Sequence, residues 1–141
     1  MYLDTSALVP LYVPELDSED CERIVADAQG IFTSELCRTE LLRALLAKQK
    51  NGLIDAKQQM TIFALFERHC DEGSVRLIPV DHSTVREAAD FMQQVAPGVL
   101  LRTLDAIHLA TYLSVDAGPL FTRDKRMIEA GRKLGLNLAG E

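Results

Sequence analysis

The amino-acid sequence predicts an α/β fold in which helices cover both faces of a parallel sheet. Short apolar runs of the β type alternate along the chain with longer segments of helical periodicity, and this alternation is typical of βαβ units. No internal repeat, low-complexity tract or linker interrupts the pattern. The length of 141 residues also suits one domain. We therefore expect residues 1–141 to form a single compact domain.

The predicted strands are short apolar or β-branched runs bounded by glycine, proline or polar residues. The first of them ends directly before Asp4, and a run near the end of the chain would close the set. The five segments are residues 1–3, 30–33, 75–80, 118–122 and 136–138.

Two long helices are predicted in the middle of the chain, over residues 35–51 and 55–71. Gly52 is a plausible helix stop and Asp55 a plausible N-cap, so the pair reads as a helical hairpin inserted into the α/β pattern. Four shorter helices are predicted over residues 18–28, 83–95, 103–116 and 124–134.

The composition limits the classes of protein to which the chain can belong. Hydrophobic residues make up 48% and charged residues 26% of the sequence, which excludes both a disordered chain and a membrane protein. The net charge of −6 does not favour general adhesion to nucleic acid or to a membrane, so nucleic-acid contact needs a local basic patch or bound metal. Cys21, Cys37 and Cys70 are widely spaced and predict reduced thiols. With no signal-peptide pattern, we expect a cytoplasmic protein with no membrane partner.

Two carboxylates stand at the predicted carboxyl ends of strands. Asp4 directly follows the first strand, and Asp124 lies two residues past Thr122 at the end of the strand over 118–122. Ligands of open α/β sheets bind beyond these strand ends, so both residues are candidates for a site. The alternative role for each is an N-cap of the following helix.

Two further carboxylates lie on predicted helices. Glu40 shares its helical stripe with small and apolar residues, where a charge needs compensation, and the alternative is a salt bridge to Arg43 at i+3. Asp105 begins the helix over 103–116, where the helix dipole favours a carboxylate, yet it shares a stripe with Leu109 and Tyr112 that points inward.

A doubly wound sheet would bring these four acids to one edge. One pair of like charges at about 4 Å costs about 4 kcal/mol at an effective dielectric of about 20, so the cluster needs compensation. Mg²⁺ and Mn²⁺ prefer oxygen ligands and are commonly completed by phosphate, and they would assist hydrolysis of a phosphodiester. Basic side chains beside two of the acids support a phosphate-bearing substrate; they are Arg102, Arg123, Lys125 and Arg126.

Four segments of the sequence resemble the PIN-domain nucleases and, within that family, the VapC toxins of bacterial and archaeal toxin–antitoxin pairs. Each segment carries one of the four acids, and their order and spacing fit the family over essentially the whole chain. The segments are Tyr2-Leu3-Asp4-Thr5-Ser6-Ala7-Leu8, Ser34-Glu35-Leu36 through Glu40-Leu41-Leu42-Arg43-Ala44, Leu101-Arg102-Thr103-Leu104-Asp105-Ala106-Ile107-His108-Leu109-Ala110, and Leu120-Phe121-Thr122-Arg123-Asp124-Lys125-Arg126-Met127.

The resemblance implies a three-layer α/β/α sandwich around a central parallel sheet. It implies an endoribonuclease that uses Mg²⁺ or Mn²⁺ to cut RNA, and a short antitoxin that occupies the groove and blocks it. Asp116 lies nearby in the sequence as the alternative to Asp124 for the fourth acid. The implied metal-binding and catalytic set is Asp4, Glu40, Asp105 and Asp124, and the substrate candidates are Thr5, Ser6, Arg102, Thr122 and Arg123.

Two other features bear on partners and on catalysis. The apolar stripes of the helices over 35–51 and 55–71 are wide enough to bury more than one partner, so we expect a homodimer or antitoxin docking there. His108 lies one turn from Asp105, but we favour a packed or hydrogen-bonded histidine over a general base, because hydroxide generated on metal needs no imidazole. We expect His69 and His82 at the surface.

The alternatives are a PIN nuclease of RNA maturation without an antitoxin and a non-enzymatic RNA-binding or regulatory α/β module. A phosphatase of the haloacid dehalogenase type needs a second Asp where Ser6 stands. A receiver module fits poorly, because only Glu35 and Asp81 follow the middle strands.

Overall fold

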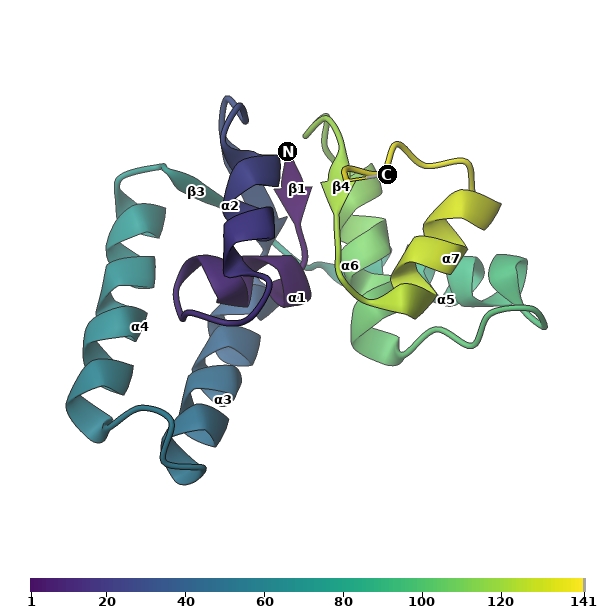
Figure 1. Ribbon diagram of the computed structural model, residues 1–141. Coiled ribbons are helices and arrows are strands. Elements are labelled where there is room, and N and C mark those ends of the chain that lie inside the picture. Colours follow the sequence, from purple (N-terminus) through teal and green to yellow (C-terminus); the bar gives the residue numbers. More distant parts are fainter. Residues whose placement is uncertain (141) are drawn as a thin grey trace.

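The computed structural model describes residues 1–140 and is built on a four-stranded parallel sheet (Figure 1). Its strands are β1 (Tyr2–Leu3), β2 (Ile31–Ser34), β3 (Val75–Ile78) and β4 (Leu120–Phe121), in the order β3-β2-β1-β4. The chain moves outward from β1 in one direction through β2 and β3, and β4 lies on the other side of β1. The strand order therefore reverses between β1 and β4, which is the place where such sheets bind ligands.

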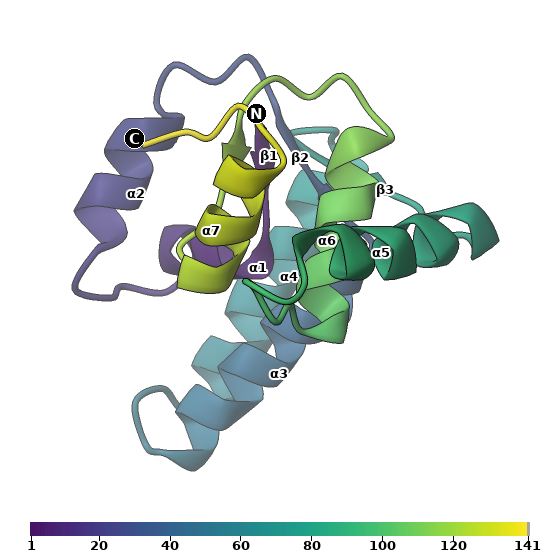
Figure 2. The same ribbon diagram turned by 90° about the vertical axis from the view of Figure 1, so that its right-hand side faces the viewer.

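Helices cover both faces of the sheet (Figures 1 and 2). One face carries the segments that pack around Leu3 and Phe121, and the other carries those that pack around Tyr2 and Leu120. The predicted three-layer α/β/α sandwich is confirmed. The first group is α1 (Thr5–Leu8), the 3-10 turn η1 (Val9–Leu11), α2 (Ser18–Val25), α3 (Leu36–Lys50) and α4 (Ala56–Asp71), and the second is α5 (His82–Val95), α6 (Thr103–Leu113) and α7 (Lys125–Lys133).

Alternation along the two central strands fixes the register of the sheet. Tyr2 pairs with Leu120 and Leu3 with Phe121, and successive side chains enter opposite cores. All four are buried, and each large apolar side chain contributes about 1.5–3 kcal/mol by leaving water. A register shift of one residue would move these side chains to the opposite faces. The pairing of β1 with β4 is therefore fixed, and the two strands end side by side.

The two long helices form the predicted hairpin, which projects from the rest of the molecule (Figure 2). Gly52 adopts a left-handed φ of 72° after α3, and Asp55 caps α4 in a reciprocal capping box with Gln58. Leu53 and Met60 are exposed by 70% and 68%, so part of the hairpin surface is apolar.

Several predicted elements are shorter in the structure. The strand predicted over 75–80 ends at Ile78, because Pro79 lacks the N–H that would continue the ladder. The segment over 136–138 forms only an isolated bridge, with Leu138 opposite Leu120. The helix predicted over 103–116 ends at Leu113, where the Ser114 hydroxyl donates to the Thr111 carbonyl. The helix predicted over 18–28 ends at Val25 in a turn.

Cys21 and Cys37 are buried free thiols and Cys70 is partly buried, as the sequence predicts. None of the helices in residues 1–140 has both the length and the apolar character that crossing a membrane requires.

Candidate active site

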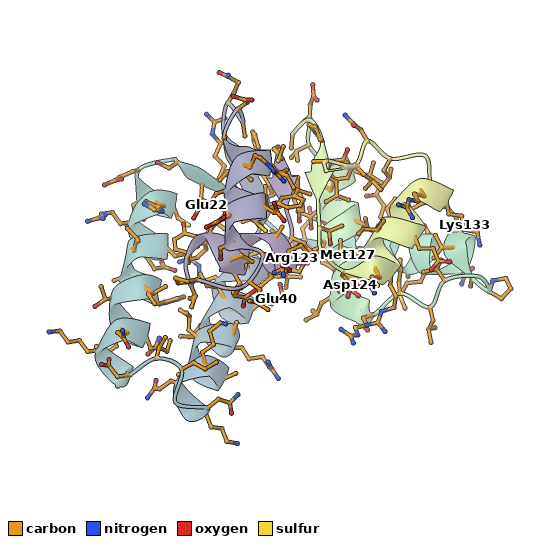
Figure 3. The ribbon with its side chains drawn as sticks, viewed as in Figure 1. Glu22, Glu40, Arg123, Asp124, Met127 and Lys133 are labelled. Atoms are coloured by element: carbon orange, nitrogen blue, oxygen red, sulfur yellow. The ribbon has the colours of Figure 1, made fainter. Side chains whose placement is uncertain are left out.

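The four acids come from four different elements that end or begin at the carboxyl edge of the sheet. Asp4 directly follows β1, Asp124 directly precedes α7, Asp105 lies in the first turn of α6 and Glu40 lies in α3. The charges of Asp4 and Asp124 both act on the carboxyl group of Asp105, which places these three close together. Figure 3 shows Glu40 and Asp124 on the side of the molecule toward which β1 and β4 run.

Asp4 is held from three directions. Its Oδ1 accepts hydrogen bonds from the Ser6 hydroxyl at 2.7 Å and the Ala7 N–H at 3.0 Å, and its Oδ2 accepts from the Thr122 hydroxyl at 2.6 Å. Burial nevertheless raises the pKa of Asp4, and its hydrogen bonds and His108 offset only part of that effect. Asp4 is thus the N-cap of α1, which was its alternative role, and its charge also acts on Asp105.

Asp124 is the N-cap of α7. Its Oδ1 accepts from the N–H groups of Arg126 at 2.8 Å and Met127 at 3.2 Å, and its own N–H donates to the Thr122 hydroxyl at 3.1 Å. Thr122 therefore connects Asp124 to Asp4 across the space between β4 and β1. This linkage favours Asp124 over Asp116 as the fourth acid, because Asp116 lies at the opposite edge of the sheet.

Glu40 is bonded to the protein through a single oxygen. Its Oε2 accepts from the Thr5 hydroxyl at 2.5 Å and from Nε2 of His108 at 2.8 Å, not from Arg43. Burial alone would raise the pKa of Glu40, but the contacts with His108 and Thr5 outweigh it and lower the pKa below its ordinary value. The carboxylate is therefore ionised and held in place before any ligand binds.

His108 is packed and hydrogen-bonded, as the sequence analysis favoured. It is 2% exposed, and its Nδ1 lies 2.9 Å from the hydroxyl of Tyr2, which is itself fully buried. The chain Tyr2–His108–Glu40 thus orients the carboxylate from inside the core. Sequence reasoning missed this role, because 68 residues separate Glu40 from His108 and no local pattern connects them. Of the other histidines, His82 is exposed, whereas His69 is half-buried and bonded to Tyr12.

Asp105 has a buried oxygen without a partner. Within residues 1–140, no hydrogen bond reaches its Oδ2. Burial raises the pKa of Asp105, as do the charges of Asp124 and Asp4, and Arg102 offsets only part of this. An unpaired anionic oxygen among like charges is costly unless a cation compensates it. The unpaired oxygen of Asp105, on which the charges of Asp4 and Asp124 act, fits a hard divalent cation such as Mg²⁺ or Mn²⁺. Within residues 1–140, however, no three of the four acids bring ligand atoms within 4.8 Å of one another.

The substrate candidates fall into two groups. The hydroxyls of Thr5, Ser6 and Thr122 are all donated to the acids, so they orient the carboxylates. The Arg123 guanidinium pairs with Glu15 at 3.0 Å and with Asp17 at 2.5 Å, whereas Arg102 is exposed at the start of α6. A cavity of about 440 Å³ opens beside these groups and is lined by Thr5, Ser6, Val9, Glu15, Arg123 and Asp124.

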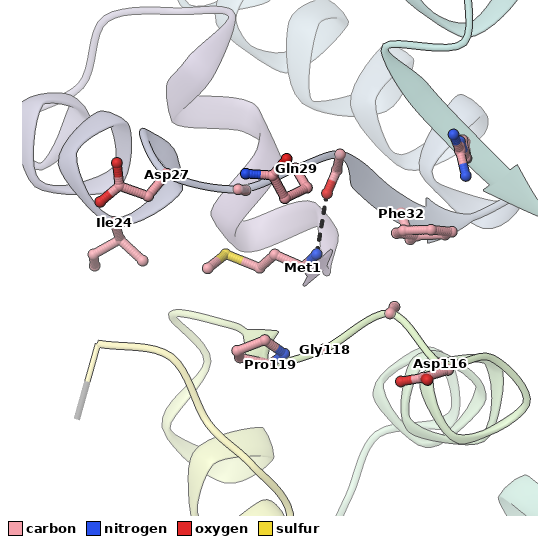
Figure 4. Close-up of a pocket in the computed structure, with 12 residues that line it drawn as sticks. Met1, Ile24, Asp27, Gln29, Phe32, Asp116, Gly118 and Pro119 are labelled. Atoms are coloured by element: carbon pink, nitrogen blue, oxygen red, sulfur yellow. Dashed lines mark hydrogen bonds between the residues drawn. The ribbon is translucent and has the colours of Figure 1, made fainter.

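A larger cavity of about 640 Å³ lies at the other edge of the sheet (Figure 4). Met1, Asp116 and Pro119 are among its lining residues, and the amino group of Met1 donates there to the Gly30 carbonyl at 3.0 Å. None of the four clustered acids lines this cavity. The cavity therefore lacks the features of the carboxyl edge, which are the charges of Asp4 and Asp124 and the unpaired oxygen of Asp105.

A family model for the PIN domain matches residues 1–133. The chain is also 36% identical over 141 residues to Ribonuclease VapC46 of Mycobacterium tuberculosis strain H37Rv, with 96% of this chain and 93% of that protein covered. The chain therefore belongs to the PIN-domain family, as its four motifs indicated.

Solved structures agree with this fold. The structure of VapC20 of Mycobacterium tuberculosis, described as a toxin that cleaves the sarcin–ricin loop, aligns with a TM-score of 0.71 and 17% identity, and covers 92% of this chain and 94% of that one. A toxin–antitoxin complex from Klebsiella pneumoniae aligns with a TM-score of 0.56 and 20% identity over 89% of this chain and 88% of that one.

Proposed function

We propose that this protein is an endoribonuclease that hydrolyses RNA phosphodiester bonds with Mg²⁺ or Mn²⁺, and that it acts as the toxin of a toxin–antitoxin pair. The observation that carries the proposal is the unpaired buried oxygen of Asp105 among the charges of Asp4 and Asp124. Family membership and the likeness to Ribonuclease VapC46 over nearly the whole chain support the same activity. We further propose that residues 1–141 act as a single nuclease domain.

The metal would be held by Asp4, Glu40, Asp105 and Asp124. When bound, the cation supplies charge compensation for these carboxylates, lowers the pKa of a water for attack and stabilises the leaving oxygen. The protein fixes Glu40 through Thr5 and His108, and it fixes Asp4 through Ser6 and Thr122. These contacts hold the carboxylates in place before the substrate arrives, so little reorganisation is needed.

The RNA backbone would contact the basic groups beside the acids. Arg102 is exposed three residues before Asp105, so its guanidinium is available to a phosphate. Arg123 is engaged by Glu15 and Asp17, so it supports the loop after β4 more than it offers charge to RNA. We propose Arg102 as the principal phosphate contact and Arg123 as a secondary one.

A cognate antitoxin is the proposed protein partner. The Klebsiella pneumoniae complex supports this, because that protein of similar fold is described together with an antitoxin. The apolar surface of the α3–α4 hairpin, which includes Leu53 and Met60, is the proposed place for antitoxin docking or homodimerisation. The cytoplasmic location stays a prediction.

The direct test is incubation of purified protein with total cellular RNA in Mg²⁺, in Mn²⁺ and in EDTA. We expect discrete cleavage products that require metal and disappear in Asp105→Asn. Asp116→Asn is the matched control, because it removes an acid from the opposite edge and should cleave like the wild type. Intact RNA in every lane, with the protein folded, would contradict the proposal and favour an RNA-binding scaffold.

A further inference from the structure

A group of metal-ligand atoms that differ in chemistry from the four acids includes one of those acids, Glu40. Sγ of Cys37, a carboxylate oxygen of Glu40 and a ring nitrogen of His108 all lie within 4.8 Å of one another. Cys37 and Glu40 are three residues apart on α3 and therefore share a face, and His108 approaches from α6. Cys37 is 0% and His108 2% exposed, whereas Glu40 is partly buried.

The chemistry of this group differs from that of the acid edge. Sulfur and imidazole nitrogen are ligands that Zn²⁺ prefers, whereas Mg²⁺ takes oxygen ligands almost exclusively. Tetrahedral zinc bonds would place the three donor atoms about 3.3–3.6 Å from one another. The contact between Nε2 of His108 and Oε2 of Glu40, now 2.8 Å, would therefore open by roughly half an ångström.

Neighbouring hydroxyls are placed to support such a site. Thr5 Oγ1 lies 2.9 Å from Sγ of Cys37, and Tyr2 contacts Nδ1 of His108 at 2.9 Å. Thr33 Oγ1 lies 2.7 Å from the same sulfur but donates its hydrogen to the Leu3 carbonyl, so it can only accept from the thiol. A ligating histidine usually makes a hydrogen bond through its other nitrogen, which fixes the orientation of its ring. The single hydroxyl hydrogen of Thr5 is donated to Glu40 in this structure. It becomes available to a thiolate when Glu40 turns toward a metal.

We propose that Cys37, Glu40 and His108 form a binding site for Zn²⁺ or a similar thiophilic divalent cation, and that its occupation inhibits the nuclease. Glu40 belongs to both sets of ligands, so an ion on Cys37 and His108 withdraws it from the acid edge. Binding releases the Cys37 thiol proton to solvent and moves the Nε2 proton of His108 to Nδ1. Nδ1–H then donates to the Tyr2 oxygen, and the Tyr2 O–H turns to donate to the hydroxyl oxygen of Thr111. The inhibition rests on the proposed nuclease function; the binding does not.

The binding test uses Co²⁺ as a spectroscopic probe of the purified protein. We expect one equivalent of Co²⁺ to produce the visible bands of a tetrahedral site and a near-ultraviolet thiolate charge-transfer band, and Zn²⁺ to remove both. Cys37→Ala and Cys37→Ser should lose the thiolate band. Cys70→Ala is the matched control and should keep it, because Cys70 lies on α4 outside the cluster. A wild-type protein without a thiolate band, or an unchanged band in both Cys37 variants, overturns the proposal.

The inhibition test measures RNA cleavage at saturating Mg²⁺ while Zn²⁺ is added. Each protein's cleavage is expressed relative to its own rate without Zn²⁺, and we expect Cys37→Ala to need at least about tenfold more Zn²⁺ for half inhibition than the wild type. Equal inhibition of the wild type and Cys37→Ala would overturn the regulatory part. Asp105→Asn separates the two proposals, since it should lose cleavage and keep the cobalt spectrum. Cobalt bands in a protein that cuts no RNA would count against the nuclease and leave the binding site standing.

Discussion

Glu40 on α3 and Asp105 on α6 show how differently two sides of one site are built. Glu40 accepts two hydrogen bonds on Oε2 and has a lowered pKa, whereas Asp105 has a buried oxygen without a partner in the described chain and a raised pKa. Both residues belong to the proposed metal-binding set. The protein therefore satisfies one carboxylate by itself and leaves the other dependent on a ligand.

The two sides of the site therefore affect the stability of the metal-free protein in different ways. Asp4 and Asp105 are destabilised in the metal-free protein, because burial and mutual repulsion oppose their charge. The hydrogen-bonded side, from Tyr2 through His108 to Glu40, is stable without a ligand. The divalent cation that we propose at this site would compensate the charges on the Asp105 side.

The largest expected effect is on RNA cleavage by variants of the two contrasted acids. Asp105→Asn should reduce the rate at least about a hundredfold, because it removes the oxygen charge that is free for the cation. Glu40→Gln should reduce the rate less, since Oε2 of Glu40 already accepts hydrogen bonds from Thr5 and His108. Single-turnover rates on one RNA at saturating Mg²⁺ measure the effects of both substitutions. Equal losses of rate in the two variants would contradict the proposed difference between Asp105 and Glu40.

The substitution His108→Ala should have the next largest effect on RNA cleavage. It removes the orienting contact to Glu40 and leaves the Tyr2 hydroxyl without its partner, so we expect about 2–3 kcal/mol of lost stability. Cleavage should fall about 10- to 100-fold, and half-maximal cleavage should require more Mg²⁺ than in the wild type, because the Glu40 carboxylate is no longer held in place. His108→Gln, whose amide can donate to Glu40, should restore part of the activity. If His108→Ala needed no more Mg²⁺ than the wild type, His108 would have a structural role alone.

The stability of the metal-free protein should respond to pH with opposite signs on the two sides. The folded pKa of Asp4 and Asp105 lies above the ordinary 3.8, so stability is lost as pH rises through their folded pKa values. The pKa of Glu40 is lowered from 4.5, so its contribution is present above 4.5 and lost as pH falls through its folded value. Melting temperatures in EDTA should therefore rise in Asp105→Asn and fall in Glu40→Gln at neutral pH. A rise in both variants would contradict the contrast.

The smallest expected effects concern the two arginines. Arg102→Ala should raise the KM for RNA several-fold, roughly 1 kcal/mol of phosphate contact, and leave the melting temperature nearly unchanged. Arg123→Ala should change the KM less and lower stability by up to about 1 kcal/mol, because its guanidinium pairs with Glu15 and Asp17 at the surface. A larger KM increase in Arg123→Ala than in Arg102→Ala would contradict this order and would show that RNA displaces the ion pairs of Arg123 with Glu15 and Asp17.

Much of this architecture follows from local sequence rules. Gly52 and Asp55 mark the hairpin because left-handed backbone and capping are local properties, and both predictions are confirmed. The same holds for Asp4 and Asp124, which follow strands and cap helices. That these caps also form a cluster depends on the parallel order of β1 and β4, which the alternation of strands and helices predicts.

The rest depends on contacts between distant parts of the chain. The sequence offers no link between His108 and Glu40, or between Arg123 and Glu15, since side-chain direction across separate elements decides both. The unpaired oxygen of Asp105 is also invisible in sequence, because it is defined by the partners that fail to reach it. Long-range geometry, not residue type, separates these groups from ordinary surface charges.

The most direct test of the metal site is the binding of Mn²⁺, measured by electron paramagnetic resonance on the wild type and on Asp105→Asn. Bound Mn²⁺ loses the sharp signal of the free ion. We expect the wild type to abolish that signal at neutral pH and Asp105→Asn to restore most of it at the same concentrations. A wild type that leaves Mn²⁺ free, or an Asp105→Asn variant that binds it equally well, would contradict the assignment of this edge as a metal site.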